Sequence, residues 1–524
     1  MKRSHLAAGA VALCLGLSAC GGSGGDTPAG PDSAAGPMVV DLISDPATLD
    51  PAKALYTNEF QLIQAFYDRL LTADEAGTIQ GYLASEWEAT PTKATVTVAK
   101  EPICDDGQPL TVEGMAKSLQ RSNEERPTMF GRSKAKITAD PAARTITIEV
   151  TEANPDLLKA LAIPSASLVC PAGLANPDQL ATQPVGSGPF VLANAVKGSH
   201  YNVTARPEYS WAPDALADRT RSPQAINYQV VSDGATRANR IVAGETNVIM
   251  SDGPSVTRLQ ADPNLTAKQA LAQGSEGLMF NHLKDLPTAD PAVRRAIAMV
   301  INRADYIQAL YSGQAEEATT LITANMGCQS SNGGLLPAYD EAAARQVLQD
   351  AGYTQNPDGT FAKGGKALTV RILSTESDKT AAEYLQAQFA KIGIASTISA
   401  QASAAWQDQL YNQLGSWDVA IMGFSTLMGT PASQIGKYFS GSHEDGNVGS
   451  IENAEFEAKR TAAFNASTED SCAAWVAAEA ELLKEVDVLP LETPLTYWFG
   501  RGATFNYQGS GGTIDPLSLR LGDQ

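Results

Sequence analysis

Few residues of this chain stand in a pattern that could catalyse a reaction. Ser133 and Lys136 have the S-x-x-K spacing of a serine acyl-transfer site, but the companion motifs S-D-N and K-T-G are missing. No G-x-S-x-G segment lies between a predicted strand and a predicted helix, where a hydrolase nucleophile would stand. The stretch 358–366 is rich in Gly and Lys but lacks the pattern of a phosphate-binding loop, so we interpret it as a hairpin or loop. We therefore expect no enzymatic activity.

Histidine and cysteine spacing predicts no metal site and no cofactor. After residue 19, the histidines are His200, His282 and His443, which are far apart and form no H-E-x-x-H segment. The cysteines that follow residue 20 form no C-x-x-C pair. An even number of cysteines in an exported chain predicts two disulfides, for which three connectivities are possible. The disulfide candidates are Cys104, Cys170, Cys328 and Cys472.

The first twenty residues have the pattern of a secretory signal peptide. Lys2 and Arg3 precede an apolar run over residues 6–17, which is too short to span ~30 Å of hydrocarbon. Cys20 resembles the lipidated cysteine of a bacterial lipobox, which predicts a lipoprotein signal peptide over 1–19 and a lipid anchor in the cell membrane. An ordinary cleaved signal peptide is the alternative. The Gly-, Pro- and Ser-rich segment 20–37 predicts a flexible tether.

The composition is that of a large acidic globular protein. The chain has 524 residues, 43% of them hydrophobic, and a formal net charge of −20. Such a length suits two or three lobes. A strongly acidic surface is unfavourable for nucleic acid and for anionic lipid head groups. We therefore expect no nucleic-acid partner, and we attribute membrane attachment to the lipid, with the folded part in the periplasm or on the outer face of the cytoplasmic membrane.

Sequence periodicity predicts strands and helices that follow one another along the chain. Alternation or a short apolar run predicts strands at 94–99, 145–150, 226–231, 368–373 and 418–423. Helical spacing and end signals predict helices over 291–307, 341–351, 378–392 and 468–484. Strands alternating with helices predict an α/β protein whose sheets are covered on both faces.

Short motifs in a fixed order give the chain a resemblance to a known family. They include Thr48-Leu49-Asp50-Pro51, Asp106-Gly-Gln-Pro-Leu-Thr111, Pro184-Val-Gly-Ser-Gly-Pro-Phe190 and the segment from Phe280 to Arg303. In this order they resemble the extracytoplasmic solute-binding proteins of ABC importers, family 5, the peptide/nickel-type group with the oligopeptide- and dipeptide-binding proteins. Gly186 and Gly188 can supply positive φ and a close backbone approach, at a turn that we interpret as structural.

The resemblance implies a bilobal fold with mixed sheets flanked by helices, the periplasmic-binding-protein-like class II (cluster C) fold, and an extra small α/β subdomain. It implies a lobe I built from 38–75, 185–275 and 488–524, a small subdomain II over 76–184, and a lobe III over 276–487. Cys104 and Cys170 then share subdomain II, and Cys328 and Cys472 share lobe III. Pairing within each lobe is the simplest connectivity, because a bridge across the hinge would hinder closure.

The function implied by the resemblance is reversible capture of a solute by hinge closure. The implied partners are a peptide or a related small solute and the permease and ATPase subunits of an ABC importer, and we expect a monomer. One alternative is a receptor for a non-peptide solute, such as a glycoside, an opine-like compound or a metal chelate. Another is an exported sensor on the same fold.

The resemblance also implies which residues line the solute. Tyr56, Thr57 and Asn58 would belong to a peptide-lining strand of lobe I, to which a peptide backbone could add. Lobe III would contribute Trp406, the turn of Gly423, Phe424 and Ser425, and Asn447. The aromatic residues among these could instead be core residues.

One departure from the family pattern concerns the solute's charge. Peptide-binding members carry an Asp after the Gly-Trp turn that pairs with the peptide ammonium, and an ungapped reading places Leu427 there. Burying an ammonium without a counter-charge costs several kcal/mol. Either Asp252, Asp418 or another acid serves instead, or the solute has no free ammonium. We therefore expect reduced affinity for simple peptides.

Overall fold

The computed structural model describes most of the chain after residue 36. The described ranges are 37–75, 77–126, 129–131, 135–270, 274–323, 326–425, 428–443, 446–467, 469–506 and 512–522. Cys20, the expected signal peptide and all but the last residue of the expected tether lie outside these ranges. Among the described residues, no helix has the length and apolar character needed to cross a membrane.

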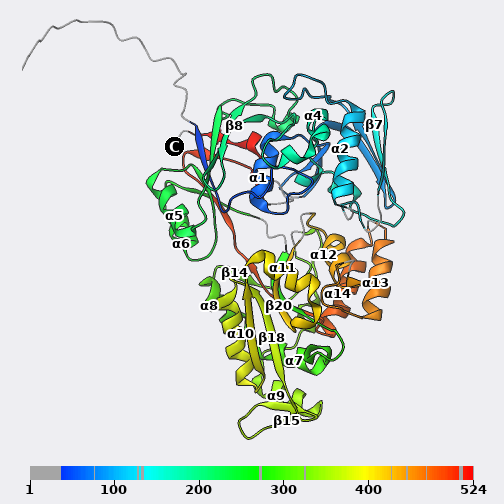
Figure 1. The fold of residues 1–524 in the computed structure, drawn as a ribbon, viewed down its shortest axis with the longest axis vertical. Coiled ribbons are helices and arrows are strands. Elements are labelled where there is room, and N and C mark those ends of the chain that lie inside the picture. Colours follow the sequence, from blue (N-terminus) through cyan, green and yellow to red (C-terminus); the bar gives the residue numbers. More distant parts are fainter. Residues whose placement is uncertain are drawn as a thin grey trace, which may run out of the picture. The chain divides into compact units, whose positions relative to one another are not determined.

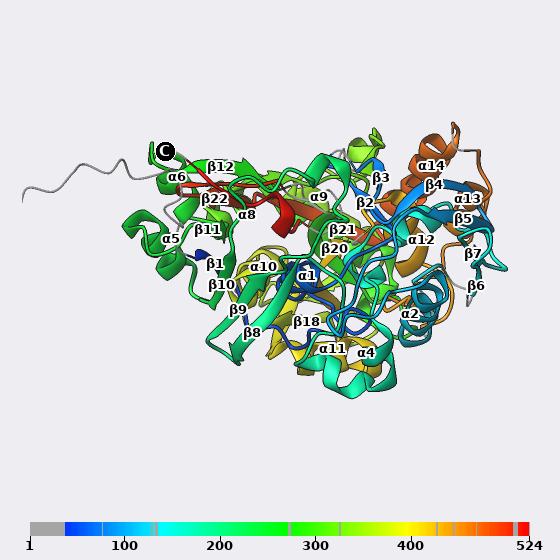
Figure 2. The same ribbon diagram turned by 90° about the horizontal axis from the view of Figure 1, so that it is seen from above.

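A mixed seven-stranded sheet collects segments from both ends of the chain. Its order, which can be followed in Figure 2, is β12 (Thr266–Gln269), β22 (Tyr497–Gly500), β11 (Val248–Ser251), β1 (Met38–Leu42), β10 (Ala225–Val230), β9 (His200–Ala205) and β8 (Phe190–Val196). Strand β1 is parallel to β10 and β11, and the other pairs are antiparallel. Helices α1 (Thr57–Phe66), α5 (Gly234–Ala243) and α6 (Ser255–Gln260) bury apolar side chains against this sheet.

A smaller antiparallel sheet lies within residues 84–149. Its order is β4 (Ala84–Thr90), β5 (Lys93–Val98), β7 (Thr145–Glu149) and β6 (Lys136–Asp140). The strands predicted at 94–99 and 145–150 are confirmed as β5 and β7. Alternate residues of β5 and β7 are buried and form one core with helix α2 (Val112–Glu125). Short helices complete this region: α3 (Leu157–Ala160), α4 (Pro171–Ala175) and the 3₁₀ turns Pro164–Ala166 and Pro177–Ala181. The hairpin of β2 (Leu71–Ala73) and β3 (Ile79–Gly81) precedes it.

A mixed six-stranded sheet contains most of the second half of the chain. Its order is β14 (Ala315–Glu317), β21 (Val488–Pro494), β13 (Gly274–Phe280), β20 (Val419–Ser425), β18 (Thr369–Thr375) and β19 (Ala395–Gln401). One core joins it to α7 (Pro291–Val300), α8 (Arg303–Tyr311), α9 (Glu341–Asp350) and α10 (Lys379–Lys391). Another core joins it to α11 (Ser403–Asn412), α12 (Pro431–Tyr438), α13 (Ala454–Phe464) and α14 (Ser471–Lys484) (Figure 1). The sheet is covered on both faces, as predicted.

The predicted helix over 291–307 is wrong in one respect, because it is two helices. Ile301 and Asn302 have extended backbone, which ends α7. The Asn302 side chain then accepts a hydrogen bond from the Asp305 N–H at 3.2 Å and begins α8 as an N-cap. The predicted helices near 341–351, 378–392 and 468–484 are confirmed as α9, α10 and α14. The stretch 358–366 lies in a small sheet of β15 (Thr354–Gln355), β16 (Phe361–Lys363) and β17 (Lys366–Ala367), as the hairpin interpretation expects.

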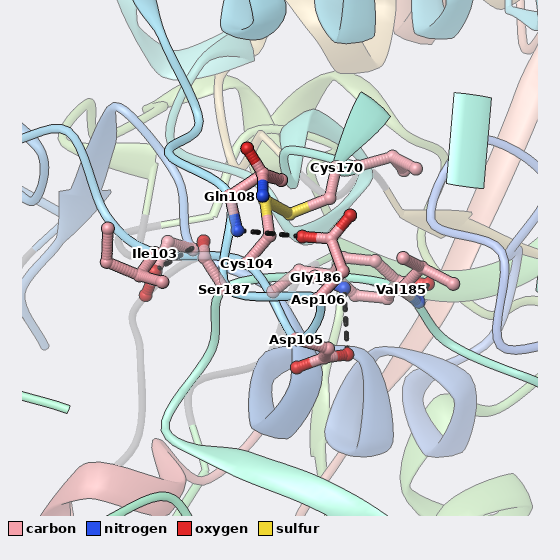
Figure 3. The surroundings of a disulfide bond; sticks show 12 residues. Ile103, Cys104, Asp105, Asp106, Gln108, Cys170, Val185, Gly186 and Ser187 are labelled. Atoms are coloured by element: carbon pink, nitrogen blue, oxygen red, sulfur yellow. Dashed lines mark hydrogen bonds between the residues drawn. A yellow bond between two sulfur atoms is a disulfide. The ribbon is translucent and has the colours of Figure 1, made fainter. Parts of the chain in front are cut away.

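Two disulfides stabilise the fold. Cys104 is joined to Cys170, with a Cα–Cα distance of 6.1 Å, and Cys328 is joined to Cys472, with a Cα–Cα distance of 5.4 Å. Each bond lies within one of the expected lobes. Figure 3 shows the first bond beside the turn at Gly186, whose N–H donates to the Asp105 carboxylate at 3.4 Å.

The glycines of that turn are needed for close packing. A Cβ at Gly186 would lie 2.2 Å from the Phe66 carbonyl oxygen, and one at Gly188 would lie 2.3 Å from the Phe66 carbonyl carbon. The expected close approach is therefore confirmed. The expected positive φ is wrong, because neither glycine has one. Space, and not backbone conformation, explains why side chains are absent here.

The lobe boundaries stay a prediction, and the strand expected to begin the last segment of lobe I pairs with the sheet of lobe III. Strand β21 begins at Val488, where lobe I is expected to resume, yet it pairs with β13 in the six-stranded sheet. The chain returns to the seven-stranded sheet only with β22. The sheet pairing therefore places the return after Pro494.

Candidate functional site

The segment expected to line the solute from lobe I is not a strand. Tyr56 is the N-cap of α1, and Thr57 is its first helical residue. The Glu59 carboxylate accepts hydrogen bonds from the backbone N–H groups of Leu55 and Tyr56. These donors are therefore occupied, and a peptide backbone cannot pair with them by strand addition. Asn58 is buried and donates to the Ser44 carbonyl at 3.1 Å, which is a structural contact.

Tyr56 and the region of Trp406 are brought together. The Tyr56 side chain is exposed, and its hydroxyl accepts a hydrogen bond from Gln407 Nε2 at 3.0 Å. Trp406, the neighbour of Gln407 on α11, packs against the core formed with α12–α14. Its indole Nε1 is buried and has no hydrogen-bond partner among the described residues. Two segments predicted to line the solute thus approach each other.

The residues of the expected Gly423–Ser425 turn lie at the end of β20 and differ in exposure. Gly423 and Ser425 are exposed, whereas Phe424 is buried and its ring centroid lies 6.0 Å from that of Phe439. Phe424 is a core residue in this structure, so it offers no wall to a solute. Leu427 lies outside the described residues.

Three other residues are candidates for contact with the solute. Two of them form hydrogen bonds within the fold, and the third is exposed. The Asn447 side chain donates to the carbonyls of Gly441 and Ile451 and accepts from the Ile451 N–H, which leaves no group free to face a solute. Both oxygens of Asp418 accept hydrogen bonds from Arg371, at 2.8 and 2.9 Å. Asp418 is therefore already neutralised. Asp252 is exposed after β11.

Two glutamates meet within the six-stranded sheet. Glu276 on β13 and Glu492 on β21 are cross-strand partners beside a register shift between Glu276 and Gly277, and both side chains reach the Tyr311 hydroxyl. The Tyr311 hydroxyl of α8 lies 2.6 Å from Oε1 of Glu492 and 3.2 Å from Oε2 of Glu276, and it donates to this pair. Glu492 is only 1% exposed, and its Oε2 has no hydrogen-bond partner among the described residues. Glu276 and Tyr311 are half-buried.

Burial and mutual repulsion raise the pKa of both glutamates. Burial is the largest cause for each, and the charge of Glu276 helps to raise the pKa of Glu492 to about 8. Asp378, next to the start of α10, also raises the pKa of Glu276. No ion pair joins either carboxylate to a Lys, Arg or His of the described residues. Burial and the neighbouring acid therefore both favour the protonated form of Glu492 near neutral pH.

The space beside this pair is open on one side. Gly423 of β20 is the cross-strand partner of Glu276 on the side away from Glu492. A Cβ placed on Gly423 would have a single atom within 4 Å, the Ser425 Oγ at 3.9 Å. One residue that the sequence predicts to face the solute thus adjoins the pair that the sequence analysis missed. The signal that could have found the pair is a carboxylate inside an otherwise apolar strand, as in Val488–Leu491 before Glu492.

Asp68 is a buried carboxylate of a different kind. It accepts hydrogen bonds from Ser187 Oγ at 2.7 Å, Tyr209 OH at 2.9 Å and Trp211 Nε1 at 2.7 Å. Burial raises its pKa to about 6 even against these three donors. All its neighbours are internal, so we interpret it as structural.

A surface hollow of about 520 Å³ lies at the β9–β10 end of the seven-stranded sheet. Its lining includes His200, Asn202, Asn227 and Gln229, and it contains none of the predicted site residues. Among the described residues, no group of three or more His, Cys, Asp or Glu is arranged to hold a metal ion.

Comparison with known protein families identifies the family of this chain. Residues 78–446 match the model described as bacterial extracellular solute-binding proteins, family 5. The chain belongs to this family. Family 5 members are solute-binding proteins of ABC transporters, a transport class and not an enzyme class. The expected α/β bilobal fold is that of the family.

Relatives of this family 5 protein are named for, or crystallised with, different solutes. Di/tripeptide-binding protein 1 of Pseudomonas aeruginosa is 26% identical over 267 residues, 51% of this chain and 47% of that protein, so the chain spans about half the length of that relative. A putative ABC transporter peptide-binding protein of Brucella ovis is 26% identical over 71% of this chain and 69% of its own length. The crystal structure of a substrate-binding protein from Microbacterium hydrocarbonoxydans with 4-hydroxybenzoate hydrazide is 27% identical, with a TM-score of 0.77 over 93% of this chain and 100% of that one.

Proposed function

We propose that this protein captures a peptide or a related small solute outside the cytoplasm and delivers it to the permease of an ABC importer. The family match over residues 78–446 carries this proposal. The peptide-binding relatives support a peptide solute. Hinge closure around the solute would form the state that the permease recognises, and it requires that the solute bind the closed state more tightly than the open one.

A non-peptide solute is the second candidate. It is favoured by the relative crystallised with an aromatic hydrazide, which this chain resembles over nearly its whole described length. The lining that we propose consists of Tyr56, Thr57, Trp406, Gly423 and Ser425. Its support is the contact of Tyr56 with α11 and the exposure of Gly423 and Ser425.

Calorimetry and X-ray scattering on the purified protein test this function. We expect a di- or tripeptide, or 4-hydroxybenzoate hydrazide, to bind and to reduce the radius of gyration. Tyr56→Ala should weaken that binding about tenfold, because it removes an exposed aromatic contact. Tyr339→Ala is the matched control, since Tyr339 is similarly exposed, at 45% against 48%. Mass spectrometry of solutes that co-purify from the native cells identifies the class, and binding without compaction would contradict the proposal.

We also propose that Cys20 carries a lipid anchor. The support is the sequence pattern of residues 1–20. Cells grown with labelled palmitate should incorporate label into the wild-type protein and not into Cys20→Ser. Equal release of both proteins into the soluble fraction, without label, would instead favour an ordinary cleaved signal peptide.

A further inference from the structure

We propose that Glu276 and Glu492 form the receptor for a positively charged group of the solute, an ammonium or a guanidinium. This inference rests on the proposed capture of a small solute. It assigns a counter-charge that the family position at Leu427 does not supply.

The first argument is the placement of two acidic side chains on adjacent strands. Directly opposed residues of an antiparallel pair have Cβ atoms about 5 Å apart, and like charges there are destabilising. Glu276 and Glu492 occupy such positions, and no described cation forms an ion pair with either. Ionisation of both glutamates would therefore be costly, and a cation between them would remove that cost.

The second argument is an oxygen without a partner. Buried polar atoms are almost always hydrogen-bonded, so each exception requires an explanation. The Oε2 of Glu492 is buried without a donor from any other described residue, whereas Oε1 accepts from Tyr311. The two carboxyl groups can hydrogen-bond to each other only while a proton lies between them. An ammonium or guanidinium carries several N–H donors, one of which could donate a hydrogen bond to this oxygen.

Access to the pair exists from the side of β20. Gly423 has no side chain to cover Glu276, and the position is exposed. Glu276 itself is only half-buried. The other acids considered from the sequence fit less well, because Asp418 is already paired with Arg371 and Asp252 is fully open to water.

Aromatic rings next to the pair suit an organic cation. The ring centroid of Tyr306 lies 6.4 Å from that of Tyr311 and 5.4 Å from that of Tyr384. Tyr306 is itself buried, and the charges of Glu276 and Glu492 both raise its pKa. Cations are attracted to such rings when water is excluded.

The neighbouring charges make binding depend on pH. Asp378 and Asp252 add negative potential at Glu276, and Glu317 of β14 is the other cross-strand partner of Glu492. Arg303 of α8 donates to the carbonyls of Ala318 and Pro490, and it forms no ion pair with the two glutamates. A bound cation stabilises the doubly ionised pair, so the proton that the pair holds is released to solvent. Affinity for a cation should therefore rise between pH 6 and pH 8.

The test uses benzylammonium and the neutral benzyl alcohol as probes of equal shape. Saturation-transfer NMR and calorimetry on the wild-type protein should show tighter binding of benzylammonium, with proton release that depends on the buffer. Glu276→Gln and Glu492→Gln should each weaken benzylammonium binding about ten- to a hundredfold, the range expected for a charge-assisted contact. Benzyl alcohol binding should change less than twofold. Glu316→Gln is the control, because Glu316 is exposed and its side chain alternates to the opposite face of β14.

A second variant tests access without touching a charge. Gly423→Leu should block the open side and weaken benzylammonium binding at least tenfold, while the melting temperature stays within a few degrees. Equal binding of both probes to the wild type, or unchanged benzylammonium binding in the Glu276→Gln/Glu492→Gln double variant, overturns the proposal. Failure of the proposed transport function is distinguishable, because it would appear as absence of compaction with peptides or the hydrazide, whatever the benzyl probes do.

Discussion

Asp68 and the Glu276–Glu492 pair are both buried acids, but their surroundings differ. Asp68 has three neutral donors directed at its two oxygens. The glutamate pair has one donor from outside the pair, the Tyr311 hydroxyl, and the buried Oε2 of Glu492 has no donor from any other described residue. Burial raises the pKa in both places, to about 6 for Asp68 and to about 8 for Glu492.

The difference separates a structural acid from a candidate binding acid. Asp68 connects the end of α1 to the turn at Ser187 and to the segment of Tyr209 and Trp211, so its charge is used inside the fold. The glutamates have no such internal use, and open space at Gly423 adjoins them. A buried acid that lacks internal partners and faces open space is thus the better indicator of a ligand.

The largest expected effect is the loss of Asp68. In Asp68→Asn, the amide offers one acceptor oxygen where the carboxylate has two, and its NH₂ group faces other donors. We expect the free energy of unfolding at pH 7 to fall by about 2–4 kcal/mol. Urea unfolding measures this, with the exposed Asp178→Asn as the control, which should change stability by less than about 0.5 kcal/mol. A loss no larger than that of the control would contradict the structural role of Asp68.

A smaller effect of opposite sign is expected at Glu492. Folding raises the pKa of Glu492 to about 8. The protonated carboxyl therefore contributes its full stabilisation of the folded state at pH values below the pKa of Glu492 in the unfolded chain. This contribution is lost as the pH rises through about 8. Glu492→Gln cannot ionise and removes that dependence. Between pH 6.5 and 9 the wild type should lose stability relative to the variant, by at least about 1 kcal/mol.

Urea unfolding of Glu492→Gln and the wild type across this range is the measurement. Asp68 and Asp487, whose pKa values are raised to about 6, titrate below this window and are present in both proteins. Parallel stability curves for the two proteins would contradict the titration of Glu492 in this range.

The smallest effects compare two tyrosines. Tyr209→Phe removes one donor from Asp68 and a hydroxyl contact with Tyr82, and should cost about 1 kcal/mol of stability. Tyr311→Phe should cost less, because Tyr311 is half-buried whereas Tyr209 is buried. Its main result should be a higher pKa for Glu492, since the Tyr311 hydrogen bond lowers that pKa. The pH-dependent loss of stability would then extend to higher pH, and an unchanged profile would contradict this contact.

Much of the fold could be predicted from local sequence. Period-2 alternation in 94–99 and 145–150 gives strands whose buried residues face α2, and Asp290 with Pro291 begins α7. The break between α7 and α8 was missed because Ile301 and Ile307 continue the apolar helical pattern, while the Asn302 cap ends it. Local capping competed with hydrophobic periodicity and prevailed.

The candidate site was predictable only in part. Gly423 and Ser425 are exposed where the family resemblance expects a lining, but Phe424 and Asn447 are committed to the core and to a loop. Tyr56, Thr57 and Asn58 lie at a helix start, because Glu59 satisfies the backbone donors that a strand would need. Side-chain capping of this kind depends on where the chain turns, and no local periodicity encodes it.

The sequence by itself determined the α/β class and the positions of most strands and helices, because these follow from short-range periodicity and end signals. It indicated the family through the resemblance of its ordered motifs. Only the tertiary structure decided that Glu276 and Glu492 are opposed, since a cross-strand partner depends on the register between segments far apart in the chain. Burial then changes what the same residue type can do. A glutamate in water is an ordinary negative charge, whereas one buried beside another glutamate holds a proton and lacks a cation.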